Sequence, residues 1–434
     1  MSESQSFLER TFQLSERGTT VSRELRGAIA TFLTMAYILF LNPLILSNAG
    51  IPIASATTCT ALAAGLCCLL MGIYANFPLA LASGMGLNAL VAFQIAGQTG
   101  SWQQAMGLVI LDGLIVLLLV LCGVREAMLR AIPLNLRRSI AAGIGLFIAF
   151  IGMKNAKIVV LGSAEAELVK FGSFKAWETW LAAAGIILTA FLLARRIKGA
   201  IILGILFCTG LAAILGKIQF QSLSAPDFSI IGQADILGVL TWKALPLLLT
   251  LLMVDFFDTL GTVSAIADQS GLQDEQGNVP HLKRVLMVDA GGAMLGGACG
   301  VSSVTSYIES AAGISEGART GLSTVFVGLF FLLIIPVASL ASAVPAAATA
   351  PALILVGFLM CEQIVRIDFE ERETAIAAFV TLIGIPMCWS ITHGIGFGFV
   401  TYVSIMLLSG KLRKVHLLMW AATALFVAYF ILEK

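Results

Sequence analysis

The chain has little charge and little histidine for its length. Of its 434 residues, 12% are charged and 3 are histidines, whereas soluble domains carry about twice that charged fraction. The net charge is +1 and no basic cluster occurs, so nucleic-acid binding is not expected. The 8 cysteines show neither metal-ligand nor disulfide-framework spacing. We therefore expect no metal and no cofactor.

Long apolar runs take the place of charge. Hydrophobic residues make up 59% of the chain, and the mean hydropathy is +0.96. Many runs approach the ~20 residues that cross a bilayer, and they lack the stripe pattern of soluble helices. The segment Met1–Leu25 is polar and lacks the apolar core of a cleavable signal. We expect a multi-pass protein of the cell inner (plasma) membrane with a cytoplasmic N-terminus.

Fourteen apolar segments are predicted to span the membrane. A further stretch, Val415–Leu432, is predicted to lie along the interface or to cross once more. The fourteen segments are Leu25–Leu46, Ala54–Tyr74, Leu79–Ala96, Gln104–Cys122, Pro133–Gly152, Trp177–Ala194, Gly199–Leu215, Ala244–Ala267, Val285–Cys299, Ser302–Ala312, Gly321–Leu340, Ala346–Cys361, Thr374–Ser390 and Gly394–Leu408.

The distribution of positive charge supports this number of spans. Cytoplasmic loops of membrane proteins are enriched in Lys and Arg. With the N-terminus inside, every arginine falls in an inside loop. The outside loops then contain only lysines, at positions 154, 157, 170, 175, 217 and 243. Removing one span would invert all later loops and destroy this segregation.

The polar stretch Gly216–Thr241 divides the chain into two halves of seven spans. An odd number of spans per half gives the halves opposite orientations, which predicts an inverted repeat. The third segment of each half, "ANFPLALASGMGLNA" and "GVSSVTSYIESAAG", looks broken rather than straight. Paired interrupted segments point to a binding site near the membrane midplane, with free backbone N–H groups at the half-helix ends.

Four acidic residues lie at membrane depth, where an ionisable group is energetically costly and its presence indicates a function. Asp255 and Asp258 are three residues apart in span eight and share a helical face. Glu309 lies in the broken span ten, and Asp112 lies in the middle of span four. No membrane-embedded Lys or Arg is available to pair with them. Carboxyl groups in such surroundings retain a proton readily, which favours a proton-coupled carrier.

Each of these polar residues also has a structural interpretation. Asp112 could link helices by packing or hydrogen bonding, and Asp258 could cap backbone. Asp289 lies near the cytoplasmic start of span nine and is expected to be solvated. Asn88 could satisfy broken backbone, and Tyr37 could be an ordinary packed aromatic residue.

Six strings carry a family resemblance: "GAIATFLTMAYILFLNPLIL", "LLMGIYANFPLALASGMGLNA", "AAGIGLFIAFIGMKNA", "VDFFDTLGT", "SVTSYIESAAGISEGARTGLS" and "VPAAATAPALILVG". Through them, in order from about Leu25 to Leu408, the chain resembles the AzgA-like purine permeases of the xanthine–uracil permease superfamily. Such proteins transport hypoxanthine, guanine or adenine and are not enzymes.

The resemblance implies an all-α polytopic fold with a core domain and a gate domain. It also implies short β-strands before the half-helices of spans three and ten. The expected divisions are a cytoplasmic N-terminal segment 1–24, core 25–122, gate 133–215, an extracytoplasmic linker 216–243, core 244–340, gate 346–408 and a C-terminal segment 411–434.

The resemblance also implies roles for individual residues. Substrate binding is expected at Asp255, Glu309, Asn88, Tyr37 and Ser306, and proton coupling at Asp255, Glu309 and Asp258. Two positions depart from the family pattern. Ser83 stands where the family usually has proline, and Asp112 stands where a small residue is expected.

These observations predict a secondary active transporter that imports purine nucleobases by proton symport through alternating access. Its expected partners are the purine substrate and membrane lipid, and by analogy a second copy in a homodimer. The alternatives are a uracil or xanthine carrier, an anion carrier of the same fold, a channel, or an intramembrane aspartyl enzyme. Several acids at the site argue against an anion, and the Gly-x-Gly-Asp signature of the enzyme is missing.

Overall fold

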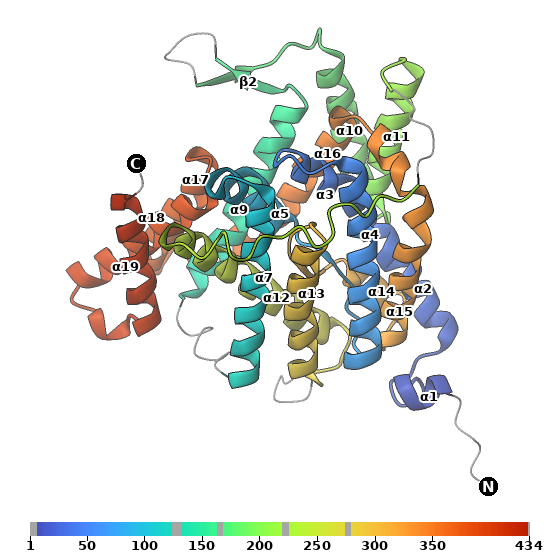
Figure 1. The fold of residues 1–434 in the computed structure, drawn as a ribbon, viewed down its shortest axis with the longest axis horizontal. Coiled ribbons are helices and arrows are strands. Elements are labelled where there is room, and N and C mark those ends of the chain that lie inside the picture. The colour runs from blue at the N-terminus through green and yellow to red at the C-terminus, as the bar shows by residue number, and fades with distance from the viewer. Residues whose placement is uncertain (1–6, 124–131, 163–167, 219–224, 274–278, 433–434) are drawn as a thin grey trace.

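The computed structural model describes residues 7–123, 132–162, 168–218, 225–273 and 279–432 (Figure 1). Arg125 and Arg130, which belong to the predicted inside loops, lie outside the described residues. Within these ranges, 9 helices are long and apolar enough to cross a membrane, and two shorter apolar helices accompany them. The prediction of a mostly helical, multi-pass membrane protein is confirmed.

The first part of the chain, up to residue 218, is helical except for three short strands. Its elements are α1 (Phe7–Phe12), α2 (Val21–Met35), α3 (Ile38–Ser47), α4 (Ile53–Leu70), η1 (Met71–Ala75), β1 (Leu81–Ser83), α5 (Met85–Leu90), η2 (Val91–Ile95), α6 (Ala96–Thr99), α7 (Trp102–Cys122), α9 (Leu134–Asn155), β2 (Val159–Leu161), β3 (Val169–Phe171), α10 (Trp177–Ala194) and α11 (Ala200–Ile214).

The second part is also mainly helical and contains one strand. Its elements are η3 (Trp242–Ala244), α12 (Leu245–Gln269), α13 (Leu282–Ala298), β4 (Val304–Ser306), α14 (Ser310–Ser315), α15 (Gly321–Ile334), η4 (Ile335–Ala343), α16 (Ala346–Cys361), η5 (Glu362–Arg366), α17 (Arg372–Met387), α18 (Ile391–Leu408), η6 (Leu412–Lys414) and α19 (Leu417–Leu432).

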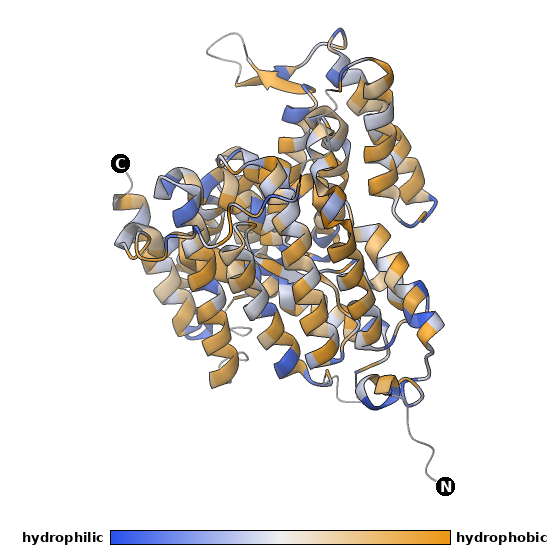
Figure 2. Cartoon of the chain, turned by 45° about the vertical axis from the view of Figure 1, so that its right-hand side comes forward, coloured by the Kyte–Doolittle hydropathy of each residue, from blue (hydrophilic) through white to orange (hydrophobic). Residues whose placement is uncertain are grey.

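Four of the described helices begin at a residue whose side chain caps the first turn. The side chains of Thr20, Ser101, Thr320 and Ser390 accept a backbone N–H in the first turn of α2, α7, α15 and α18. At the other end of α7, Gly123 adopts the left-handed conformation that terminates a helix. Hydrophobic residues predominate along the long helices (Figure 2).

The helices pack in two groups. In one, α9 packs against α16 and α17, α10 packs against α11 and α16, and α17 packs against α18. In the other, α7 packs against α12 and α13, and α4 packs against α3 and α15. Glycines allow close crossings in both groups. A Cβ on Gly357 would lie 2.4 Å from Gly145 O, and one on Gly321 would lie 2.1 Å from Gly72 O.

Residues 225–241 form a strap that passes the start of α4, the end of α13 and the start of α7 (Figure 1). The Ser55 hydroxyl at the start of α4 donates to the Asp227 carboxylate. The backbone N–H groups of Gly232 and Asp235 donate to Ala298 O and Gln103 O, each at 2.8 Å. The β2–β3 hairpin lies at the opposite end of the molecule from the N-terminus (Figure 1).

Candidate functional site

Two short strands meet in the interior of the helical bundle. β1 pairs antiparallel with β4, with Leu81 opposite Ser306 and Ser83 opposite Val304. Every residue of both strands is buried. The pairing continues at both ends, through Gly84 N to Ser303 O and Tyr307 N to Ala80 O, each at 2.9 Å. Buried backbone at membrane depth must be hydrogen-bonded, and this ladder pairs the stretches that precede α5 and α14.

Glu309 lies directly after β4 and contacts the first predicted span. That span is not one helix, because the chain is interrupted at Ala36–Tyr37 between α2 and α3. At this interruption the Tyr37 hydroxyl donates to Glu309 Oε1 at 2.5 Å. Tyr37 is 2% exposed, whereas Glu309 is only partly buried. The Glu309 carboxylate is therefore held from one side and open on the other.

Asp255 and Asp258 occupy different environments, although they are three residues apart on α12. Asp255 is 1% exposed; its Oδ1 accepts from the Ser303 hydroxyl at 3.3 Å, and its Oδ2 has no partner among the described residues. Asp258 is exposed, as are Gly261 and Ser264, which follow it on the same face. This exposed face of α12 continues to the C-terminal end of the helix. Asp255 is thus buried, whereas Asp258 lies on the exposed face of α12.

Asp289 is buried, and the prediction that it is solvated is wrong. α13 already begins at Leu282, so Asp289 lies about two turns inside the helix, and only 2% of it is exposed. Its Oδ2 accepts from the Thr259 hydroxyl at 2.6 Å, and its Oδ1 accepts from the Ser306 hydroxyl at 2.7 Å. Two hydroxyl donors stabilise a buried carboxylate. Ser306, predicted to bind substrate, directs its hydroxyl to Asp289.

Asp112 lies against Asp255. Its side chain is fully buried in α7, and neither of its oxygens has a partner among the donors of the described residues. Its carboxyl group is within hydrogen-bonding reach of the Asp255 carboxyl, and the Asp289 charge is close to both. The sequence provided no reason to place α7 against the span-eight acids.

Asn88 is fully buried in α5 and contacts Ser83 rather than open space. The Ser83 Oγ lies 2.7 Å from Asn88 Oδ1 and 2.5 Å from Val301 O. A hydroxyl has one proton and serves one of these acceptors, so turning the Asn88 amide lets its NH2 group donate to Ser83. In either orientation one polar atom of the amide remains unpartnered among the described residues. Ser83, at the position where the family has proline, thus anchors the end of β1.

The structure separates the candidate residues into two layers. The accessible layer consists of Asp258, which is exposed, and Glu309, which is partly exposed and bonded to Tyr37. The charges of Asp258 and Glu309 are close enough to interact. A buried layer lies behind them, on α7, α12, α13 and β4. Its members are Asp112, Asp255, Asp289, Asn88 and Ser306.

Aromatic rings fill the contact between η2 and the helix group of α9 and α17. Phe93 and Phe147 each make an edge contact with the Trp389 ring, at centroid distances of 6.1 and 5.1 Å. Close by, the backbone N–H of Thr392 donates to Gln94 Oε1 at 3.1 Å. The two helix groups are in close contact here, whereas Asp258 is exposed along α12.

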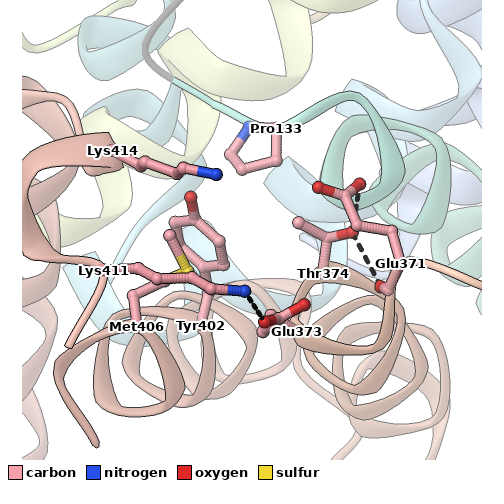
Figure 3. A pocket seen from close by; sticks show the side chains of 8 residues that line it. All are labelled: Pro133, Glu371, Glu373, Thr374, Tyr402, Met406, Lys411 and Lys414. Atoms are coloured by element: carbon pink, nitrogen blue, oxygen red, sulfur yellow. Dashed lines mark hydrogen bonds and ion pairs between the residues drawn. The ribbon is translucent and has the colours of Figure 1, made fainter. Parts of the chain in front are cut away.

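A separate polar pocket of about 210 Å³ lies where α17 and α18 meet the start of α9. Lys411 pairs with Glu373 across it, and Thr374 donates to Glu371 at 2.8 Å (Figure 3). None of the predicted site residues lines it. The full lining is Pro133, Glu371, Glu373, Thr374, Tyr402, Met406, Lys411 and Lys414.

Comparison with known proteins gives a consistent result. Residues 22–388 match the profile of the Permease family, the xanthine/uracil permeases. The adenine permease AdeP of Escherichia coli is 39% identical over 413 residues, covering 94% of this chain and 92% of that protein. The guanine/hypoxanthine permease PbuG of Bacillus subtilis is 38% identical over 442 residues, covering 98% and 99%.

Among solved structures, the transmembrane domain of the cyanobacterial bicarbonate transporter BicA is similar in fold. It superimposes with a TM-score of 0.59 at 18% identity, covering 89% of this chain and 97% of that domain. At this identity the similarity concerns the fold alone.

Proposed function

This chain belongs to the Permease family of xanthine/uracil permeases, and from that premise we propose that it imports purine nucleobases by proton symport. It is a transporter and not an enzyme. Relatives that align over nearly their whole length are named as permeases for adenine and for guanine/hypoxanthine. The proposed substrates are therefore adenine, guanine and hypoxanthine.

The observation that carries the proposal is the pair of accessible carboxyl groups, Glu309 and Asp258, beside the paired strands β1 and β4. A purine base is flat and neutral, and its edge carries N–H donors next to ring-nitrogen or carbonyl acceptors. A carboxylate accepts two adjacent N–H groups, which suits Glu309 and Asp258 as partners of the base. The Tyr37 hydroxyl fixes Glu309 from the buried side. An anionic substrate would be repelled by the same acids.

The proposed architecture is fourteen spans in two inverted halves of seven, with the N-terminus in the cytoplasm. Its support is the position of β1 and β4, each before a short helix in the third segment of its half, and their antiparallel pairing. Interrupted helices at the interface of inverted repeats are typical of midplane transporter sites.

Alternating access is proposed as movement of the α9–α11 and α16–α18 group, the gate, against α2–α7 and α12–α15, the core. The aromatic contact of Phe93 with Trp389 would close one side while Asp258 is reached from the other. The ion pair of Lys198 with Glu316 joins the two groups and would have to break when they separate.

The test is uptake of labelled adenine, guanine and hypoxanthine into proteoliposomes with an imposed pH gradient, with xanthine, uracil and sulfate as competitors. Purine uptake that collapses with a protonophore is expected. Asp255→Asn and Glu309→Gln should abolish it, whereas Asp268→Asn, at the exposed end of α12, should not. Uptake driven by a sodium gradient, or competition by sulfate alone, would refute the proposal.

A further inference from the structure

Asp112 has an environment that a structural role does not explain. A buried polar side chain that merely links helices makes hydrogen bonds to them, because an unsatisfied buried group is costly. Asp112 is fully buried, yet neither of its oxygens has a donor among the described residues. α7 packs against α12, and this brings Asp112 next to the Asp255 carboxyl, whose Oδ2 also lacks a donor among the described residues.

Two carboxyl groups in contact in a dry site do not both ionise, because like charges repel strongly at low dielectric. The ion pairs among the described residues involve Glu178, Glu316 and Glu373, and none includes Asp112 or Asp255. A proton between the two carboxyl groups would supply the donor that both lack. One group then donates its O–H to the other, which remains an ionised acceptor.

The charged groups around the pair are mainly acidic. α13 contributes Asp289, and α12 itself contributes Asp258. The segments β4, α5, α6 and η2 carry no titratable residue. α9 brings Arg137 to α12, but its guanidinium lies over the Phe257 ring, 5.3 Å from the ring centre. Asp289 already has two hydroxyl donors as a carboxylate, so the shared proton is placed on Asp112 and Asp255.

We propose that Asp112 and Asp255 hold one proton between them and that this pair, behind the substrate layer, is where the transported proton is stored. Asp112 is the positioning residue, because its ionised form makes loss of the last proton from Asp255 unfavourable. The role of this pair in transport rests on the proposed purine symport, whereas the sharing of the proton between the two carboxyl groups is independent of it.

The pair is separated from the accessible layer by only one turn of α12. Asp258 lies three residues after Asp255 and is exposed, while Asp112 and Asp255 are buried. The buried Ser303 hydroxyl, which donates to Asp255, comes from the segment just before β4. A movement of the paired strands β1 and β4 would therefore reach the pair through the hydrogen bond from Ser303 to Asp255.

The experiment compares wild-type protein with Asp112→Asn, Asp112→Glu and the exposed control Asp268→Asn. In purified protein, infrared spectroscopy follows the absorption of protonated carboxyl groups as the pH is raised. Without the second carboxylate, the last proton should leave at a pH about 1–3 units lower in Asp112→Asn. Asp112→Glu keeps two carboxyl groups and should retain the wild-type titration, as should Asp268→Asn.

In proteoliposomes, the alkaline limb of the purine uptake profile should shift to lower pH by the same amount in Asp112→Asn, with uptake at acidic pH retained. An unchanged infrared titration, or a uniform loss of uptake at every pH with an unchanged profile, would overturn the proposal and leave Asp112 a structural residue. A sodium requirement in place of the pH dependence would also overturn it. If no purine moves at all, the proposed function fails, whereas the infrared titration still tests the pair.

Discussion

The contact between Tyr37 and Glu309 leads to a quantitative prediction. Tyr37→Phe removes a hydroxyl that donates to Glu309 Oε1 at 2.5 Å and leaves the ring in place. Hydrogen bonds to charged groups contribute about 1.5–3 kcal/mol. Glu309 is only partly buried, so water can replace part of the lost bond. We therefore expect the lower value, about 1.5 kcal/mol, which corresponds to a roughly tenfold lower kcat/KM for purine uptake.

The assay is initial uptake of labelled purine over a range of concentrations, with surface expression measured in parallel. The loss should be mainly in KM, because the hydroxyl orients a carboxylate that is expected to contact the base. Tyr74→Phe is the matched control; Tyr74 is 46% exposed, and its ring lies under the Arg284 guanidinium. Equal kinetics for Tyr37→Phe and Tyr74→Phe would refute the role assigned to this contact.

Two further predictions concern stability. Gly321→Ala would bring a Cβ to 2.1 Å from the Gly72 carbonyl oxygen and should destabilise the protein by about 1–3 kcal/mol; Gly97→Ala, with no neighbour within 4 Å, should melt like the wild type in detergent. The Ser55 hydroxyl and then the Ser229 N–H hold the pKa of Asp227 below its ordinary value. Because the pKa of Asp227 is lower in the folded state, its ionised carboxylate stabilises the fold above the pKa of the unfolded state, and this stabilisation is lost as the pH falls. Ser55→Ala should therefore reduce the drop in melting temperature between about pH 5 and pH 3. An unchanged drop would contradict this interpretation.

The helical framework could be predicted from the sequence because lipid imposes a simple pattern. α10 and α16 begin and end at the predicted residues, and the family resemblance is confirmed by the profile match and the relatives. The broken third segments were visible as polar and glycine-rich interruptions. The strands β1 and β4 have three residues each, too few for a periodic pattern, and their presence was implied only by the resemblance.

Contacts between distant segments could not be predicted. No glycine or proline lies at the interruption at Ala36–Tyr37, and Pro43 follows six residues later inside α3, so the sequence does not mark its position. The burial of Asp289 depends on hydroxyl groups supplied by α12 and β4. The contact of Asp112 with Asp255 depends on how α7 packs, which a single sequence does not specify.

The central claim is that a purine base binds between α12 and the paired strands β1 and β4, beside Asp258 and Glu309. The most direct measurement is an electron cryo-microscopy structure of the protein with adenine, guanine or hypoxanthine bound. The account predicts density for the base within hydrogen-bonding distance of the Glu309 and Asp258 carboxyl groups. Density for the base elsewhere, such as in the pocket of Glu373 and Lys411, with both carboxyl groups free of it, would contradict the account.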